Sequence, residues 1–404
     1  MIRPRTVLLL GLSQLFCWGL FYYLIGGFGE AMAASLGWSD ALVQGGFSAA
    51  LLVMGLISGL VGRLIDRHGG RPVMVAGSLL GSVGCLGLAF AETVVPYYAA
   101  WIVLGVAMRC TLYDAAFAAL ARIGGTEARR PMAQITLLGG LASTAFWPLG
   151  HLLAEHFGWR GALVAYAALA LLTLPFHLAI PATRHGPAAA ASQRPQDSPP
   201  ETRPRLAAAV LYALIVAVTS FLNSAMAAHM IGLMAGLGLA AGTAVTLSSL
   251  RGIGQSSARL GEVLFGRRLH PLSLNLLALT ILPLGFAAGL AAGGLAAGGL
   301  MAGGFVTAAA AFALLYGAGN GLSTITRGTL PLVLFDHRTY GALVGRLLAP
   351  SFLASAAAPV AYALVIERWG AHGGLVLSLA AALLLLAAGA VLKLAYGRQA
   401  SGAS

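Results

Sequence analysis

The sequence predicts an all-α membrane protein whose chain crosses the bilayer twelve times, as two pseudo-symmetric halves of six helices each. Three observations lead to this prediction: the composition, the spacing of apolar runs, and a weak internal repeat around a proline-rich break. Of the 404 residues, 59% are hydrophobic and only 9% are charged. Soluble domains carry about 25% charged residues. The chain therefore has too few charges for a soluble surface, which excludes soluble nucleic-acid enzymes, disulfide scaffolds and disordered tails.

The apolar runs divide the chain into twelve predicted spans. Twelve spans of about 20 residues would occupy about 240 positions and leave the rest for loops and tails. Each span must be a helix, because lipid offers no hydrogen-bond partner to an unpaired peptide group. The first run is too long for the apolar core of a signal peptide, so we expect a retained helix. The runs lie near residues 6–29, 41–61, 73–91, 96–120, 132–154, 161–181, 206–232, 240–262, 272–292, 306–331, 341–365 and 373–396.

A break in the middle of the chain separates the two predicted bundles. Residues 182–205 hold five prolines together with Ser, Gln and Asp, and such a segment cannot bury a core. We therefore expect an N-terminal six-helix bundle at residues 1–181, a flexible cytoplasmic linker at 182–205, and a C-terminal six-helix bundle at 206–404.

The two halves also resemble each other at a constant offset. The segments 155–158 (Glu-His-Phe-Gly) and 367–370 (Glu-Arg-Trp-Gly) each close the fifth span of a half, and 367 − 155 gives an offset of 212. At the same offset Gly105 meets Gly317. Many secondary transporters are built from such a duplicated unit, with the substrate site between the repeats near the bilayer midplane.

The formal net charge of +12 comes from 24 basic and 12 acidic residues, and the positions of the basic residues indicate how the chain is oriented in the membrane. If the N-terminus is cytoplasmic, all but six basic residues lie on the cytoplasmic side, as the positive-inside rule requires. Both termini are then cytoplasmic, and no nucleic-acid partner is needed to explain the charge. Abundant Ala and Gly with a single lysine favour a bacterial inner (plasma) membrane. The six exceptions are Arg160 and Arg368 in outer loops and Arg109, Arg251, Arg259 and Arg327 within spans.

The loop between the second and third spans contains a family signature. Gly62, Asp66, Arg67, Gly69 and Arg71 match the pattern G-x-x-x-D-R-x-G-R-[RK] in place, with Gly70 at a position that is usually basic. This segment resembles the cytoplasmic signature of the major facilitator superfamily. The resemblance implies a monomeric secondary transporter whose two halves rock in alternating access.

The resemblance also implies gating roles for the five signature residues. In the family the acid at Asp66 bonds across to the second half and stabilises the outward-open state. Gly62 is expected to let two helices approach closely, and Gly69 to supply a tight turn. In the second half the equivalent loop lacks the acid. At the cytoplasmic end of the tenth span, Arg327 is expected to snorkel or to form an inner gate with Asp336.

Two further patterns bear on the branch of the family. Arg109 stands where many proton-coupled exporters carry an arginine, but Leu112 and Tyr113 replace the Gln and Gly that follow it there. The fifth span also matches the exporter pattern poorly, so the drug-antiporter branches are disfavoured. The chain is instead similar to the monocarboxylate and oxalate/formate branch, in Gly-Trp-Ser at 37–39, Gly-Trp-Arg at 158–160 and an arginine in the eighth span.

Two arginines near the middle of their spans are the main candidates for substrate binding. Arg109 and Arg251 would each cost about 2.5–3.5 kcal/mol at a helix centre. We expect them to form a cationic cavity for an anionic substrate, since a guanidinium suits a carboxylate. The alternative is that each pairs with a buried acid or with helix carbonyls.

Few acids are available to pair with these arginines. Asp114 follows Arg109 by five residues, about 140° around a helix, so the two are not expected to share a face. Asp114 is a candidate proton carrier, or a structural partner of Arg67 or Arg122. Within the eighth span, Arg259 and Glu262 are expected to pair locally.

Polar and aromatic residues at mid-depth complete the predicted cavity. In this superfamily the first, fourth, seventh and tenth helices line it, so candidates follow by resemblance. Each could equally be a helix-packing residue. The substrate-binding candidates beside the two arginines are Gln14, Trp18 and Tyr22 in the first span, Asn223 in the seventh, and Tyr316 and Asn320 in the tenth.

The function expected from these features is transport. The sequence shows no His/Cys/Asp cluster, nucleophile elbow or phosphate loop, so we expect no enzyme activity, no metal and no cofactor. The first hypothesis is proton-coupled movement of a small organic anion such as a monocarboxylate. The alternative is proton-driven efflux of a drug or metabolite, with Asp114 carrying the proton; a non-transporting membrane sensor is the third. The expected partners are an anionic small molecule, a proton and membrane lipid.

Overall fold

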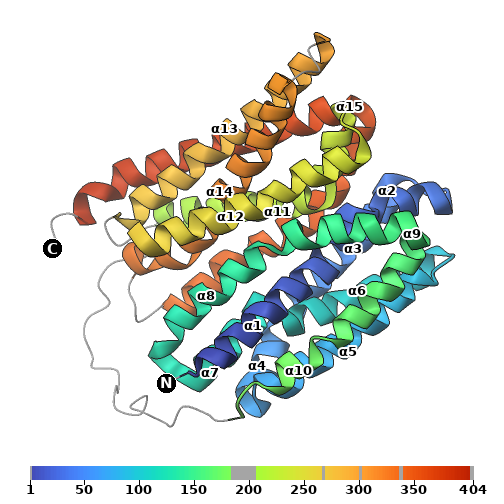
Figure 1. Cartoon of the computed structure of the whole chain (residues 1–404). Coiled ribbons are helices and arrows are strands. Elements are labelled where there is room, and N and C mark those ends of the chain that lie inside the picture. The colour runs from blue at the N-terminus through green and yellow to red at the C-terminus, as the bar shows by residue number, and fades with distance from the viewer. Residues whose placement is uncertain (1, 183–205, 266–268, 300–302, 336–339, 401–404) are drawn as a thin grey trace, which may run out of the picture.

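The computed structural model describes residues 2–182, 206–265, 269–299, 303–335 and 340–400 (Figure 1), and the regular secondary structure in these ranges is entirely helical. All of the predicted linker except residue 182 lies outside the described residues. Asp336, the predicted gate partner of Arg327, also lies outside them. The helices of the first half are α1 (Pro4–Cys17), the π-helix η1 (Trp18–Tyr22), α2 (Leu24–Leu36), α3 (Asp40–Leu56), α4 (Ser58–His68), α5 (Gly70–Ala89), α6 (Val94–Thr111), α7 (Tyr113–Gly124), the 3-10 helix η2 (Gly125–Ala128), α8 (Arg129–Gly140), α9 (Ala142–Leu171) and α10 (Leu174–Leu178). Those of the second half are α11 (Leu206–Gly236), α12 (Ala241–Phe265), α13 (Pro271–Ala297), α14 (Gly303–Leu334) and α15 (Tyr340–Ala400).

By length and apolar composition, eight described helical segments could cross a membrane, or nine with the bent pair α3 and α4. Two of these segments, Arg130–Leu178 and Leu347–Tyr396, each cover two predicted spans, and α12 lies at the predicted eighth span, so the described helices account for the twelve predicted spans. Several spans are composed of two helices in series: α1 and α2 through η1, α3 and α4 across a bend of 52°, and α6 and α7. Conversely, α9 and α15 each contain parts of two successive spans, which are separated by a single non-helical residue, Gly158 in α9 and Gly370 in α15. Most helices extend a few residues beyond the apolar runs, whereas α5 and α10 end two or three residues before the predicted ends at 91 and 181.

The internal repeat is visible in the backbone. Gly158 has φ 68° and divides α9, and Gly370 has φ 65° and divides α15. A side chain at such a positive φ is strained, so glycine is the residue that permits this turn. The two turns lie 370 − 158 = 212 residues apart, which is the offset expected from the sequence. The fold therefore consists of two pseudo-symmetric six-helix halves.

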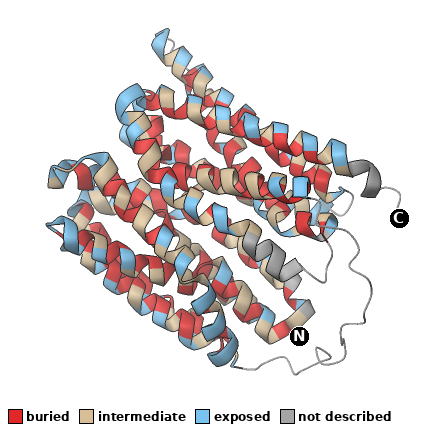
Figure 2. Ribbon diagram, turned by 180° about the vertical axis from the view of Figure 1, so that it is seen from behind, coloured by how far each residue is buried: buried red, intermediate tan, exposed pale blue. Residues whose placement is uncertain are grey.

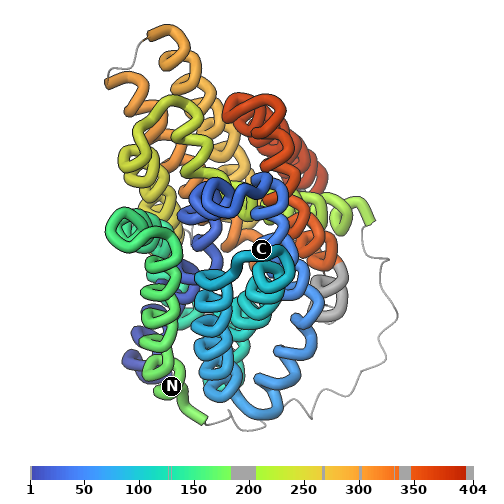
Figure 3. The backbone as a smooth tube through the Cα atoms, turned by 90° about the vertical axis from the view of Figure 1, so that its right-hand side faces the viewer, coloured from blue at the N-terminus to red at the C-terminus, as the bar shows by residue number. Residues whose placement is uncertain are grey.

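The halves lie side by side, with the described ends of α1 and α15 at the same end of the bundle (Figure 1). Seen from the side in Figure 3, the blue-to-green helices of the first half lie mainly below and the yellow-to-red helices of the second half mainly above. Burial is concentrated where helices face one another, and exposed residues cover the outer faces (Figure 2). Large apolar side chains are common on those outer faces, for example Leu394 at 80% exposure. Such an exterior suits lipid.

Hydrogen bonds connect the two halves along α12. Thr144 Oγ1 on α9 donates to the Ser249 carbonyl at 2.6 Å, and Ser256 Oγ donates to the Leu137 carbonyl on α8 at 2.9 Å. Small side chains allow α12 to pack closely against α8 and α9, and their hydroxyl groups form hydrogen bonds between the helices. The eighth span is therefore tied to the fifth, and this contact sets the position of the charged residues that α12 carries.

Candidate functional site

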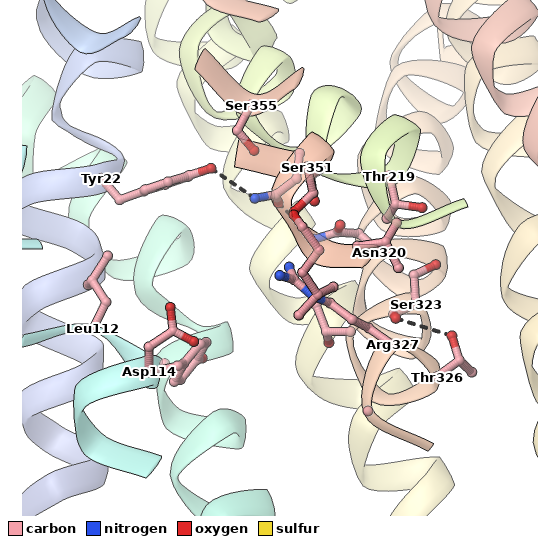
Figure 4. Close-up of a pocket in the computed structure, with 18 of the residues that line it drawn as sticks. Tyr22, Leu112, Asp114, Thr219, Asn320, Ser323, Thr326, Arg327, Ser351 and Ser355 are labelled. Atoms are coloured by element: carbon pink, nitrogen blue, oxygen red, sulfur yellow. Dashed lines mark hydrogen bonds between the residues drawn. The ribbon is translucent and has the colours of Figure 1, made fainter. Parts of the chain in front are cut away.

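A cavity of about 390 Å³ lies between the two halves and is lined by both (Figure 4). The first, fourth, seventh and tenth spans all contribute, as the resemblance implies, and the second, fifth, eighth, ninth and eleventh add further residues. Its two sides differ in chemistry. The first half contributes five rings, three apolar side chains and Asp114, and the second half contributes mainly hydroxyl and amide groups, with Phe352 as its one ring.

The aromatic wall is a connected set of four rings from the first half: Trp18, Tyr22, Tyr113 and Phe117. The ring centroids of Trp18 lie 4.7 Å from those of Tyr22 and 4.9 Å from those of Tyr113. Tyr113 stacks on Phe117 at 5.6 Å with 13° between the planes. Two interruptions of helix geometry bring these rings together: Trp18 and Tyr22 bound the π-helical turn η1, and Tyr113 is the first residue of α7.

The polar wall comes from the second half, and a hydrogen-bonded chain joins it to the aromatic wall. Asn223 Oδ1 accepts from Arg251 Nη2 at 2.7 Å and from Asn320 Nδ2 at 3.1 Å. The Asn223 amide nitrogen donates to the Tyr22 hydroxyl at 3.0 Å. The other polar cavity residues of this half are Thr219, Ser220, Gln255, Arg259, Asn275, Ser323, Thr324, Thr326, Arg327, Ser351 and Ser355.

Arg251 lies fully buried at the middle of α12. Its guanidinium lies between the rings of Tyr23 and Tyr316, 5.2 Å and 5.1 Å from their centroids. Its Nε and Nη1 have no hydrogen-bond partner among the described residues, and no described carboxylate pairs with it. It does not itself line the cavity, but the side chains that hold it, Tyr23 and Asn223, do. The site thus contains a buried cation, two of whose nitrogen donors have no hydrogen-bond partner among the described residues.

Arg109 and Asp114 form an ion pair, and the prediction that they do not share a face is wrong. That prediction assumed one continuous helix. In the structure α6 ends at Thr111, Leu112 is extended with ψ −175°, and α7 begins at Tyr113. The break turns the Asp114 carboxylate back toward Arg109. The acid also lies in the first turn of α7, where a helix dipole favours negative charge.

This pair changes two further expectations. Asp114 is not the partner of Arg122, whose Nε instead donates to the backbone carbonyl of Asp66 at 3.2 Å, nor of Arg67, which is exposed. Asp114 lines the cavity, whereas Arg109 does not. The two arginines predicted to share one cationic cavity therefore have different surroundings. Arg109 is paired with an acid, and Arg251 is not.

Arg259 is a cavity residue that the sequence reasoning missed as a site. Its expected partner Glu262 is not the one it has, because the guanidinium points inward between α8 and α14. Nη1 donates to the Thr136 carbonyl at 2.6 Å, and Nη2 donates to Thr324 Oγ1 at 2.9 Å. Arg251 and Arg259 are eight residues apart, about 80° around a helix. This spacing places Arg259 within a quarter turn of Arg251 on the same helix, and it is the sequence signal that could have indicated a second inward-facing arginine.

The remaining candidates of the first and tenth spans divide into cavity and packing positions. Trp18, Tyr22 and Asn320 line the cavity. Gln14 does not: its Nε2 donates to the Thr111 carbonyl at 2.8 Å and ties α1 to the end of α6. Tyr316 lies behind the cavity wall, where its ring covers Arg251 and its hydroxyl donates to the Leu222 carbonyl at 3.1 Å.

The signature loop lies at the junction of α4 and α5, away from the cavity. Gly69 has φ 90° and forms the expected tight turn. Arg71 Nε donates to the Ile180 carbonyl at 2.7 Å, which ties the third span to the end of the sixth. Gly62 has open space beside it, so the expected close approach of helices is wrong there in this conformation. Asp66 is exposed and forms no ion pair with the described part of the second half. Arg327 lines the cavity.

Comparisons with known proteins agree with this architecture. A family model described as Major Facilitator Superfamily matches residues 10–312. Monocarboxylate transporter 3 of Mus musculus is 35% identical over 140 residues, which are 33% of this chain and 27% of that protein. Multidrug resistance protein MdtL of Escherichia coli is 30% identical over 185 residues, which are 45% of this chain and 46% of that protein. The chain thus matches less than half the length of either relative.

Solved structures share the fold from end to end. The crystal structure of the nucleoside transporter NupG has a TM-score of 0.69 at 14% identity, covering 96% of this chain and 98% of that one. A bacterial homologue of the human lysosomal transporter Spinster, in an inward-facing and occupied conformation, has a TM-score of 0.66 at 14% identity, covering 98% of both chains. With the family model matching residues 10–312 and this fold throughout, the chain belongs to the major facilitator superfamily of membrane transporters.

Proposed function

We propose that this protein moves a small organic anion across a bacterial inner membrane by alternating access, and that Arg251 binds the anion's carboxylate. The observation that supports this most strongly is the environment of Arg251. A guanidinium that is fully buried, with two nitrogen donors unpaired and no acid beside it, is costly to leave without an anion.

The hydrogen bonds around Arg251 also favour the binding of an anion there. The amide oxygen of Asn223 accepts from Arg251 and from Asn320 at the edge of the cavity. A neutral amide oxygen is a weaker partner for a guanidinium than a carboxylate, because charge-assisted hydrogen bonds are roughly twice as strong as neutral ones. A substrate carboxylate that displaced Asn223 would therefore gain two donors and cancel the buried charge.

We propose that Asp114 carries the coupled proton. Its carboxylate lines the cavity and pairs with Arg109 across the break between α6 and α7. Protonation of Asp114 would remove the negative partner of Arg109 and weaken the tie between the two helices. Proton binding could in this way change the shape of the fourth span, which carries the cavity residue Tyr113. We also propose that both termini are cytoplasmic, which the distribution of basic residues supports.

Transport measured in proteoliposomes tests the role of Arg251. We expect Arg251→Gln to abolish uptake of a labelled carboxylate driven by a proton gradient, while Arg368→Gln, at an exposed site beside the turn that divides α15, leaves uptake unchanged. Arg251→Lys keeps the charge but loses the planar fork, so partial activity is expected. Wild-type uptake in Arg251→Gln protein would contradict the proposed role.

Efflux of a drug or metabolite is the second candidate function. Two observations favour it: the similarity to MdtL over 45% of this chain, and the connected aromatic wall, which suits flat apolar compounds. The two functions make different predictions. Efflux predicts that neutral or cationic aromatic compounds are exported and that Arg251→Gln retains this activity. Resistance profiling of a strain that overproduces wild-type or variant protein distinguishes them.

A further inference from the structure

We propose that the transported anion carries an aromatic ring, which lies against the aromatic wall while its carboxylate reaches Arg251. This inference rests on the proposed function and narrows it, from any small carboxylate to an aromatic or comparably flat carboxylate. It follows from the shape and the uneven chemistry of the cavity.

The size of the cavity argues against a three-carbon acid as the preferred substrate. Its volume of about 390 Å³ falls in the range of about 300–1,000 Å³ that is usual for drug-sized ligands. A three-carbon acid would leave most of this space to water and would leave the rings of the first half without a partner. A ring attached to the carboxylate would occupy this space and would contact the rings of the first half.

The aromatic wall is presented to the cavity and is not merely core packing. Trp18, Tyr113 and Phe117 are all cavity-lining residues, although most aromatic side chains of the first half pack inside its bundle. Trp18 Nε1 also has no hydrogen-bond partner among the described residues. Rings placed edge-to-face or offset-stacked on such side chains gain more than their buried area alone provides.

The opposite wall determines how the ring is oriented. The second half contributes Thr219 and Gln255 to the cavity lining, and their Oγ1 and Oε1 atoms have no partner among the described residues. Figure 4 shows Tyr22, Leu112 and Asp114 on one side of the space and Thr219, Asn320 and Ser323 on the other. A flat ligand would place its face on the rings and its polar edge toward the hydroxyl and amide groups. The carboxylate would then point to Asn223, which covers Arg251.

Calorimetric binding to the purified full-length protein tests this with a matched ligand series. The probes are benzoate, cyclohexanecarboxylate with the same charge and similar size but no aromatic ring, lactate, and uncharged benzamide. We expect wild type to bind benzoate about three- to tenfold more tightly than cyclohexanecarboxylate, which corresponds to the contribution of one aromatic contact. Lactate should bind more weakly than both.

Variants of Trp18 test whether the preference for benzoate comes from the aromatic wall. Trp18→Leu should reduce the benzoate preference to less than twofold, whereas Trp18→Phe, which keeps a ring, should retain most of it. Trp369→Leu removes an exposed ring, 61% accessible, beside the turn that divides α15, and should leave the preference unchanged. Thermal unfolding of each variant checks that it is folded.

The outcomes separate the two proposals. Equal affinity of wild type for benzoate and cyclohexanecarboxylate, or an unchanged preference in Trp18→Leu, overturns the aromatic inference and leaves carboxylate transport intact. If benzamide binds as tightly as benzoate, the ring preference stands and the proposed role of Arg251 fails. If none of the carboxylates binds wild type, both proposals are wrong.

Discussion

Replacing Gly254 by alanine should loosen the helix that carries both Arg251 and Arg259. Gly254 lies on α12 against the backbone of α14, and an added Cβ would meet the carbonyl oxygen of Leu314, with the carbonyl carbon at 3.0 Å and Cα at 3.1 Å. These are backbone atoms, so they cannot rotate away as the end of a flexible side chain could. The helices must move apart, and Arg251 moves with α12 relative to Tyr316 on α14.

A second glycine on the same helix gives the matched control. Gly261 is also in α12 and has nothing within 4 Å of an added Cβ. Both substitutions gain up to about 1 kcal/mol of helix propensity. Only Gly254→Ala adds the cost of overpacking, about 1–3 kcal/mol. We therefore expect the free energy of unfolding of Gly254→Ala to lie about 1–3 kcal/mol below that of Gly261→Ala.

The three native cysteines provide the assay. Cys17, Cys85 and Cys110 are free and buried, so a thiol-reactive fluorescent dye reports their exposure as the protein unfolds in detergent with increasing SDS. Uptake in proteoliposomes measured in parallel should fall for Gly254→Ala and not for Gly261→Ala. The reasoning is refuted if the two variants unfold within about 0.5 kcal/mol of each other, which is the usual error of additivity.

Three further predictions use the same unfolding assay. A double-mutant cycle of Arg109→Gln and Asp114→Asn should give a coupling of only about 0.2–1 kcal/mol, because the Asp114 side chain is 60% exposed; a coupling above about 3 kcal/mol would show a fully desolvated pair. Tyr97→Phe should cost about 0.5–1.5 kcal/mol, since its buried hydroxyl donates at 2.8 Å to a carbonyl of α3, and more than Tyr98→Phe, whose hydroxyl is part-buried. Ser39→Ala should cost about 0.5–1 kcal/mol by removing the N-cap bond of α3, and Ser39→Asp should restore it.

The fold was predictable because membrane insertion imposes regularities on the sequence that local packing does not override. Apolar runs have to be long enough to cross the bilayer, and every backbone group has to be paired, so the spans could be located within a few residues. The repeat could be located as well, since Gly158 and Gly370 are required by a positive φ and glycine supplies this freely. Each of these features can be recognised in the sequence of a segment, without knowledge of the side chains packed against it.

The errors in the site have a common cause: they concern backbone geometry that departs from an ideal helix, or side chains that cross between segments. The Arg109–Asp114 pair depends on the extended conformation of Leu112, which an angular count on a straight helix cannot include. The partners of Arg259 lie on α8 and α14, far away in sequence, whereas its predicted partner Glu262 was close. For a buried arginine, acceptors on packed neighbours are better placed than an acid near the end of its own helix.

The uneven division of the cavity between the halves also bears on how substrate binding and conformational change are linked. All but one of the cavity rings belong to the first half, the exception being Phe352 of α15, and Arg251 with its amide neighbours belongs to the second half. A ligand that carries both a ring and a carboxylate would contact both halves at once, so its full binding energy is available only while the halves are close together around it. A ligand can shift a conformational equilibrium only by its differential affinity for the two states. A lone carboxylate would contact mainly the second half and would bind similarly whether the halves are apart or together. The two-sided ligand would therefore stabilise the closed intermediate of the alternating-access cycle that we propose.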